Sequence, residues 1–271
     1  MASDQSGGTL RHELERAIRS GRCVYCRRAA APDEPLTHEH VIPRARGGTR
    51  RDVSIIVPAC ARCNQRRGCS ELVRFLLLRP SRIAAFLDYL STLSPDGLRQ
   101  LDDRVLAEVY AAVWMLRESR KEGDAWRERL KRLCAGRTLH RRRYAARRVV
   151  GALGGRLETM RERSASDGET APVVDGDQGW MGPIPEDAVA QVDSRLIAVF
   201  ALAWQVSEVV VREELSRQQD RVLRGEVWTR GEAEELDEPR KRPRRRRLRV
   251  DRRRGRPART RQRQAARAVR G

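Results

Sequence analysis

Two Cys-x-x-Cys pairs constrain the fold of this chain more than any other feature. Cys23 and Cys26 form the first pair, and Cys60 and Cys63 form the second. The sequence opens without an apolar secretory signal segment, so we expect a compartment in which disulfides are rare. The four thiolates then predict a closed, tetrahedral structural zinc site. The 33 residues between the pairs exceed the roughly 15–20 of a zinc ribbon, which predicts folded structure between them.

The segment between the pairs has the pattern of two short strands joined by a basic loop. Leu36–Ile42 and Val53–Val57 are rich in β-branched residues, which favours extended structure. The adjacent glycines Gly47 and Gly48 permit a tight turn in the loop. No strand pattern follows the second cysteine pair, so we expect a short helix there. Before the first pair, Leu10–Arg19 has apolar residues at helical spacing.

The stretch from Thr37 to Gly68 resembles the HNH (ββα-metal) endonucleases, in the form that carries two zinc-binding Cys-x-x-Cys knuckles. The matching parts are Glu39-His40-Val41-Ile42-Pro43, Gly47-Gly48, Cys60-Ala-Arg-Cys63-Asn64 and Arg67-Gly68. With the first cysteine pair they stand in the order of the family and near its spacing. The resemblance covers about residues 20–70 and implies the ββα-metal fold for that segment.

The resemblance also implies a role for each matching residue. The zinc would be structural, because four cysteines leave no open position for water. His40 would be the general base that takes a proton from the water attacking the scissile phosphate. Glu39 and Asn64 would hold Mg²⁺, Mn²⁺ or a similar divalent ion through their oxygens. Neighbouring residues on a strand point to opposite faces, so Glu39 and His40 share a site only at a strand end or bulge.

The sequence departs from the family pattern at two positions. Glu39 stands where aspartate is common, and Ile55 stands at the position of the middle Asn of the HNH name. In the family that Asn orders the loop around the base. Two functions therefore remain open. One is an active, metal-dependent DNA endonuclease that hydrolyses phosphodiester bonds. The other is a catalytically weak or dead zinc module that serves as a binding or structural protein in a DNA-packaging or ribonucleoprotein particle.

Arginine supplies nearly all of the positive charge, since Lys+Arg number 57 against 37 Asp+Glu, with a net charge of +20, and only three of the bases are lysine. Guanidinium groups match phosphate, so we expect a nucleic acid partner, DNA first and RNA second. The predicted contacts are Arg44, Arg46, Arg50, Arg51, Arg66, Arg67, Arg254 and Arg256. Arg254-Gly-Arg256-Pro257 resembles an AT-hook core, although chance matches also occur in so arginine-rich a segment.

Composition divides the chain into six segments and predicts an α+β fold that is mostly α. A small zinc-clamped ββα module is followed by helices and a basic tail. The segments are an N-terminal helix (1–19), the HNH-like module (20–70), a helical region with a basic end (71–163), an acidic linker (164–193), an apolar and acidic helix (194–238) and a disordered arginine-rich tail (239–271).

Three helical stretches carry specific predictions. Ser94-Pro95 predicts the start of one helix that runs to Arg120 with an apolar stripe. Residues 137–150 form a basic helical stretch that could lie on phosphate, on an anionic membrane or in solvent. The apolar helix 194–224 could pack on the helical core, pair with a second copy of the chain or recruit a protein partner.

The longest apolar run, Leu196 to Val211, has 16 residues, fewer than the roughly 18 of a membrane span. We therefore expect no membrane partner and a soluble, intracellular protein that is not secreted. Cys69 and Cys134 fall outside the paired pattern and are expected to be free thiols. His38 lies two residues before His40 and could assist the same site.

Overall fold

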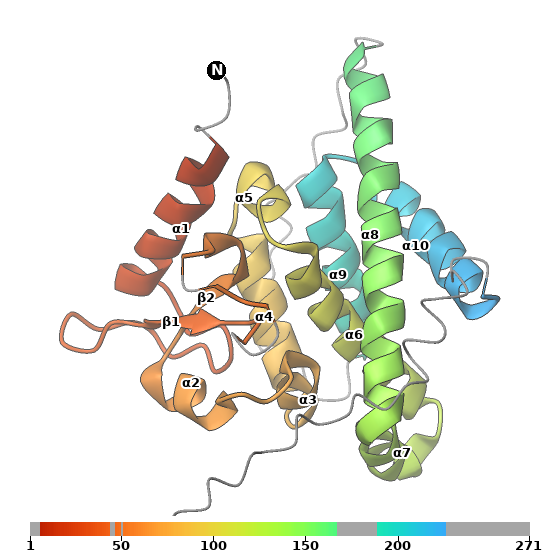
Figure 1. Cartoon of the computed structure of the whole chain (residues 1–271), viewed down its shortest axis with the longest axis horizontal. Helices are drawn as coiled ribbons and strands as arrows, with labels where there is room; N and C mark the ends of the chain where they lie inside the picture. The colour runs from red at the N-terminus through yellow and green to blue at the C-terminus, as the bar shows by residue number, and fades with distance from the viewer. Residues whose placement is uncertain (1–5, 44–46, 50, 167–188, 226–271) are drawn as a thin grey trace, which may run out of the picture. The chain divides into compact units, whose positions relative to one another are not determined.

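The computed structural model of the chain describes residues 6–43, 47–49, 51–166 and 189–225. They belong to one compact unit, Met1–Arg230, while a second unit, Gly231–Gly271, lies outside the described residues. The predicted disordered tail and several of the predicted nucleic-acid contacts also lie outside them: Arg44, Arg46, Arg50, Arg254 and Arg256. The described part is mostly helical with one two-stranded sheet, which confirms the predicted fold class (Figure 1).

The sheet and the helix after it form a ββα unit. Strand β1 (Thr37–His40) pairs antiparallel with β2 (Ile56–Ala59), and helix α2 (Ala61–Arg67) follows directly. Strand β2 begins later than predicted, because Val53–Ile55 forms a 3-10 helix (η2). The Asp52 side chain caps η2 by accepting a hydrogen bond from the next residue but one, which stabilises a turn where the composition favours a strand.

Nine other α-helices of the described part surround this unit or extend from it (Figure 1). Besides α2 they are α1 (Ser6–Ser20), α3 (Leu72–Leu77), α4 (Ser81–Ser91), α5 (Pro95–Arg99), α6 (Asp103–Arg120), α7 (Trp126–Leu133), α8 (Gly136–Ser166), α9 (Val189–Trp204) and α10 (Glu208–Leu223), with a 3-10 turn at Gly123–Ala125.

The single helix predicted from Ser94 to Arg120 is wrong, because it is divided into α5 and α6. Ser94 caps α5 through the N–H of Gly97, as predicted. A second cap residue, Asp102, then accepts from the N–H of Arg104 and starts α6 afresh. The backbone N–H of Asp102 also donates to the carbonyl of Ser54 at 3.0 Å, which ties the start of α6 to η2.

The apolar stretch 194–224 is likewise two helices, α9 and α10, and the prediction of one helix is wrong. Gln205 takes a left-handed conformation (φ +54°) and ends α9, and Ser207 caps α10. Helix α9 packs against α4, α5 and α6, and Phe200 and Leu196 are buried there. The apolar face of α9 therefore packs on the core of its own chain.

Within the described residues, no single helix has the length and apolar content of a membrane span. The helices Gln191–Trp204 and Glu208–Leu223 have that length and apolar content only when they are taken together, and the chain bends by 107° between them.

The basic stretch 137–150 belongs to α8, which packs along α6 and α10. Helix α8 continues to Ser166, so the first residues of the predicted acidic linker are helical, as are its last residues, in α9. The remainder of that linker, 167–188, lies outside the described residues.

The ββα unit and the helices share one hydrophobic core. The ring of Tyr25, from the turn before β1, lies 5.0 Å from that of Phe75 on α3 in an edge-on contact and 6.1 Å from that of Phe86 on α4. All three rings are buried. The unit is therefore held by the helices behind it as well as by its own sheet.

Candidate functional site

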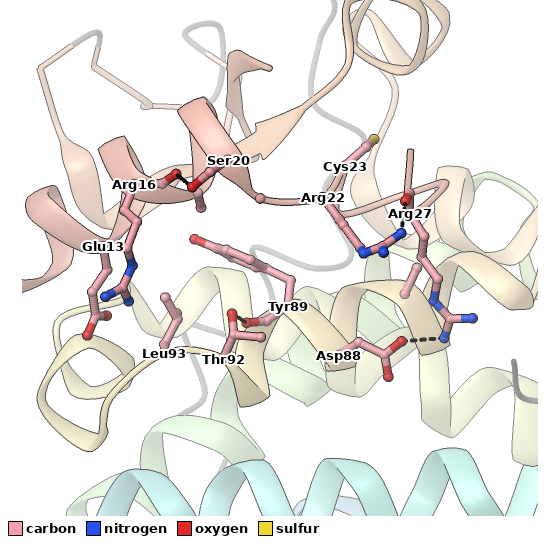
Figure 2. A pocket seen from close by; sticks show the side chains of 13 residues that line it. Glu13, Arg16, Ser20, Arg22, Cys23, Arg27, Asp88, Tyr89, Thr92 and Leu93 are labelled. Carbon is pink, nitrogen blue, oxygen red and sulfur yellow. Dashed lines mark hydrogen bonds and ion pairs between the residues drawn. The ribbon is translucent and has the colours of Figure 1, made fainter. Parts of the chain in front are cut away.

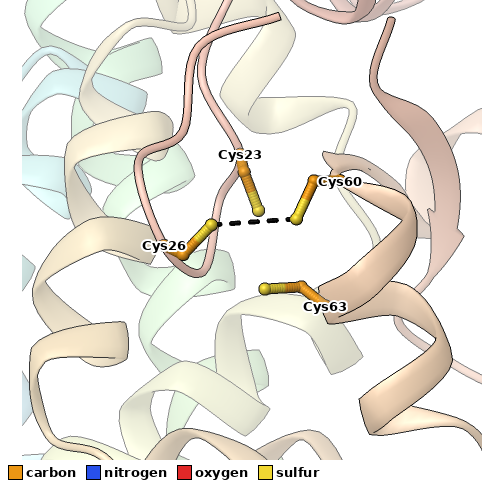
Figure 3. A group of neighbouring side chains, drawn as sticks. All are labelled: Cys23, Cys26, Cys60 and Cys63. Carbon is orange, nitrogen blue, oxygen red and sulfur yellow. Dashed lines mark hydrogen bonds between the residues drawn. The ribbon is translucent and has the colours of Figure 1, made fainter. Parts of the chain in front are cut away.

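Four cysteine side chains gather at one end of the sheet (Figure 3). The sulfur atoms of Cys23, Cys26, Cys60 and Cys63 all lie within 4.8 Å of one another, and the Sγ atoms of Cys26 and Cys60 are 3.8 Å apart. Tetrahedral zinc with Zn–S bonds of about 2.3 Å separates its ligands by about 3.8 Å. The donor set and its spacing therefore fit a structural zinc ion, and sulfur pairs separated by 33 residues in the sequence meet at one point.

Backbone hydrogen bonds position the two cysteine pairs. The first pair lies in a turn that Arg27 closes in a left-handed conformation (φ +60°), with its N–H donating to the carbonyl of Cys23 at 2.9 Å. The N–H of Val24 donates to the carbonyl of Pro58 at 3.0 Å and joins this turn to β2. Cys60 is the N-cap residue of α2 and Cys63 lies in its first turn. The helix start thus fixes the second pair.

The thiols of this cluster need a cation to ionise together. Burial raises the pKa of Cys23 to about 11, and burial together with the charge of Cys23 raises the pKa of Cys63 well above its ordinary value. Adjacent thiolates repel one another in a low-dielectric site, and a bound Zn²⁺ would reverse that balance. Cys69 is exposed and Cys134 half-buried, and neither forms a disulfide.

His40 occupies the last position of β1, opposite Ile56. The side chain is half-buried, and its Nε2 atom is buried with no hydrogen-bond partner among the described residues. Its backbone carbonyl accepts from Nη1 of Arg67 at 3.1 Å. This nitrogen keeps its electron pair unused by described protein groups, and a reactant would reach it only after the side chains that cover it move aside.

Glu39 and Arg67 form a buried ion pair. The sequence predicted a divalent-ion ligand at Glu39 and a nucleic-acid contact at Arg67 instead. Nη1 of Arg67 donates to Oε1 of Glu39, and the side chains of both residues are 2% exposed. The Tyr25 hydroxyl lies 3.5 Å from the same carboxylate oxygen. Burial raises the pKa of Glu39 to about 7, against the opposing effect of the Arg67 charge. As a nucleic-acid contact, Arg67 is a wrong prediction, because its guanidinium lies in the interior.

The expected ligands of a catalytic divalent ion are not presented as one set. Asn64 uses its amide Nδ2 to donate to Oγ1 of Thr37 at 3.0 Å and to the carbonyl of His38 at 3.3 Å. The Glu39 carboxylate is engaged by Arg67 on the same, inward side of β1. His40 is the strand neighbour of Glu39 and points to the other face. In this arrangement Glu39 and Asn64 do not fit a shared Mg²⁺ ion.

Asp52 orders the loop end of the hairpin, a role that the sequence analysis missed. Its carboxylate accepts from the N–H of Ser54 at 3.1 Å and from the Ser54 hydroxyl. The neighbouring Ile55 is fully buried, and its carbonyl accepts from the N–H of Val41 at 2.9 Å. An Asp two residues before a serine is a known turn signal that could have identified this cap. The turn at residues 52–55 is thus capped without the Asn that Ile55 replaces.

Positive charge continues from the glycine loop onto the helices. Arg51 and Arg66 are exposed, as nucleic-acid contacts must be. Nη1 of Arg104, on α6, lies 3.7 Å from the position that a Cβ atom would take at Gly47. Arg104 also forms a bidentate pair with Asp102. No motif in the sequence indicates that α6 places a basic side chain beside this loop.

Comparison with known proteins assigns the segment that contains this site. Residues 23–71 match the family model of the HNH endonucleases, which confirms the resemblance found in the motifs. No curated protein and no solved structure gave a significant match to the chain. The match spans both cysteine pairs, both strands and α2, so it indicates a nuclease-type function for the ββα unit.

Proposed function

We propose that residues 23–71 hydrolyse phosphodiester bonds in DNA, with His40 as the general base. The observation that carries this proposal is the unpartnered Nε2 atom of His40, at the strand end of an HNH-matching unit closed by the cysteine cluster. A general base accepts a proton on a nitrogen electron pair, and no described protein group donates to this one.

The residues around His40 position it. The Arg67 guanidinium donates to the carbonyl of His40 and to that of Val41, so it anchors the strand end from inside. The zinc cluster holds α2, which carries Arg67, against β1. HNH nucleases use divalent metal ions, so cleavage by this chain should require one.

Nucleic-acid binding is the second part of the proposal. The net charge of +20 resides mostly in arginine, which suits the phosphate backbone. Exposed Arg51 and Arg66 lie in the HNH-matching segment, and Arg104 lies beside its glycine loop. The arginine-rich tail 239–271 would add sequence-independent attraction to DNA.

A plasmid assay tests the proposal. Supercoiled plasmid is incubated with the zinc-loaded full chain in Mg²⁺ or Mn²⁺, with and without chelator, beside the variant His40→Ala. We expect metal-dependent nicking that His40→Ala reduces by at least about 100-fold, the usual contribution of a general base. His12→Ala is the matched control, because His12 is exposed on α1. Equal nicking by wild type and His40→Ala would contradict the proposal.

A structural zinc module is the second candidate, favoured by the burial of Glu39 and by Ile55. A chain that has lost turnover would keep the cysteine cluster and its positive surface. In the same assay it would bind plasmid and shift its mobility without cutting under any metal condition. That outcome would favour a role in packaging nucleic acid.

A further inference from the structure

The buried arginines of the described residues, Arg67 and Arg82, differ in how their charge is balanced. Arg67 pairs with the Glu39 carboxylate. Arg82 lies in the first turn of α4, is 6% exposed and forms no ion pair with a carboxylate among the described residues. A buried charge without a partner is strongly unfavourable, so a balancing negative charge of another kind should act on Arg82.

The hydrogen bond and the ring contact of Arg82 are both made to one uncharged residue. Its Nη1 donates to the carbonyl of Phe75 at 2.7 Å, and its guanidinium carbon lies 3.9 Å from the centre of the Phe75 ring. A cation–π contact and one neutral acceptor recover only part of the hydration that a buried guanidinium loses. These contacts therefore leave much of the charge unbalanced.

Phe75 connects Arg82 to the cysteine cluster. The Phe75 ring also packs edge-on against the ring of Tyr25, at 5.0 Å, and Tyr25 stands in the turn between the two cysteines of the first pair. Both rings are buried. The first turn of α4 is thus joined to the cysteine turn through two packed aromatic side chains.

The cysteine cluster supplies negative charge to this part of the core. Four thiolates outweigh the charge of one Zn²⁺ by two. Cys23, Cys60 and Cys63 are buried, so water screens that charge only in part. Burial, followed by the charge of Arg79, lowers the pKa of Arg82, whereas a negative charge on Cys63 raises it. A thiolate at Cys63 and the Arg82 guanidinium therefore attract one another.

Three other arginines near the cluster are paired or exposed. Arg27, which follows the first cysteine pair, points its guanidinium at the Asp88 carboxylate (Figure 2). Arg66 and Arg79 are exposed, so water and salt screen their charges. Of these four arginines, Arg82 is the one that combines burial with the lack of a described carboxylate partner.

We propose that Arg82 is the counter-charge of the zinc cluster. It stabilises the four thiolates from the interior when Zn²⁺ is bound, whereas protonated thiols in the metal-free chain offer it no charge. Arg82 lies outside the HNH-matching segment 23–71, so zinc binding is coupled to the start of α4. This role involves no DNA and can hold or fail independently of hydrolysis at His40.

Zinc affinity tests this role. The zinc dissociation constant of the full chain is measured in reducing buffer by competition with a chromophoric chelator. Arg82→Gln keeps an N–H donor for the Phe75 carbonyl but removes the charge. We expect it to bind zinc at least about 10-fold more weakly, because the attraction between charges in a partly buried site is worth at least that factor. Arg82→Met removes the charge at similar length and should give the same loss.

Two further variants separate charge from packing and from general surface charge. Arg82→Lys keeps a positive charge and a donor, so it should recover most of the affinity. Arg79→Gln is the matched control, because Arg79 is exposed three residues before Arg82, and it should bind zinc as the wild type does.

Four results would overturn the proposal. The first is equal zinc affinity of wild type and Arg82→Gln, and the second is a wild-type chain that binds no zinc. The third is an equal loss in Arg82→Lys, which would assign the effect to packing. The fourth is an equal loss in Arg79→Gln, which would assign it to surface charge.

Discussion

At the scale of single residues, the Glu39–Arg67 pair joins strand and helix at the site. Arg67 ends α2 and Glu39 lies on β1, and the guanidinium also reaches the carbonyls of His40 and Val41. A buried charge that keeps its partner is tolerated, whereas a buried charge that loses its partner is strongly unfavourable. The pair therefore couples the position of the base to the integrity of the fold.

A double-mutant cycle measures this coupling. Arg67→Ala should lower the free energy of unfolding by about 3–5 kcal/mol, because the buried Glu39 carboxylate loses its partner and must take up a proton, and the carbonyls of His40 and Val41 lose their donor. Adding Glu39→Gln to Arg67→Ala should recover part of that loss, because the neutral amide needs no proton to remain buried. Denaturant unfolding of the four zinc-loaded proteins gives the values. Strictly additive losses would show that the two side chains act independently.

The sequence could not reveal this pair, although it identified both residues as functional. They are 28 positions apart, and their contact depends on the register of β1 and on the exit angle of α2. The motif places an acidic residue before His40, but strand alternation decides that Glu39 points inward. Predictions that rest on local chemistry, such as the four cysteines, needed no such register and are confirmed as a metal-binding geometry.

At the scale of elements, the strand–strand–helix order followed from the motif, while several helix boundaries did not. Caps decided the differences: Asp102 restarts a helix after α5, and Ser207 restarts one after the left-handed Gln205. Apolar periodicity runs through both breaks, so it favoured longer helices than the chain forms. Asp52 likewise turns the predicted second strand into a 3-10 helix at its start.

We predict that helix α8 contributes to nucleic-acid binding through one of its arginines. Arg143 pairs with Glu108 on α6, whereas exposed Arg147 has no ion pair within the described residues. Burial and the charges of Arg143 and Arg104 lower the pKa of Arg147, while the carboxylates of Glu108 and Asp102 oppose that shift. Of these residues, Arg104 lies beside the glycine loop. If nucleic acid follows the charge from that loop, its backbone reaches α8 at Arg147.

Arg147→Gln should weaken binding of duplex DNA and reduce the slope of log affinity against log salt by about 0.9, the value for one phosphate contact. Arg156→Gln is the control, because Arg156 is exposed on the same helix and nine residues further on, at about the opposite azimuth. Titrations in chelator separate binding from cleavage. An unchanged slope in Arg147→Gln, or an equal change in both variants, would remove α8 from the DNA-binding surface.

In the molecule as a whole, the cysteine cluster brings together two segments that lie far apart in the sequence. It closes the ββα unit across the 33 residues between the pairs, and Tyr25 ties that unit to α3 and α4. The positions of His40, of Arg67 and of helix α2, which carries Arg67, all depend on this closure. Loss of the ion should therefore disturb both the site and the surrounding core.

Elemental analysis of the purified native chain tests the central claim most directly. We expect about one zinc per chain, retained in Cys69→Ser and lost in Cys63→Ser, since Cys63 belongs to the four-cysteine cluster and Cys69 does not. Chelation should lower the melting temperature of the wild type and of Cys69→Ser alike. A native chain that contains no zinc, or a Cys63→Ser variant that binds zinc as tightly as the wild type, would contradict the account.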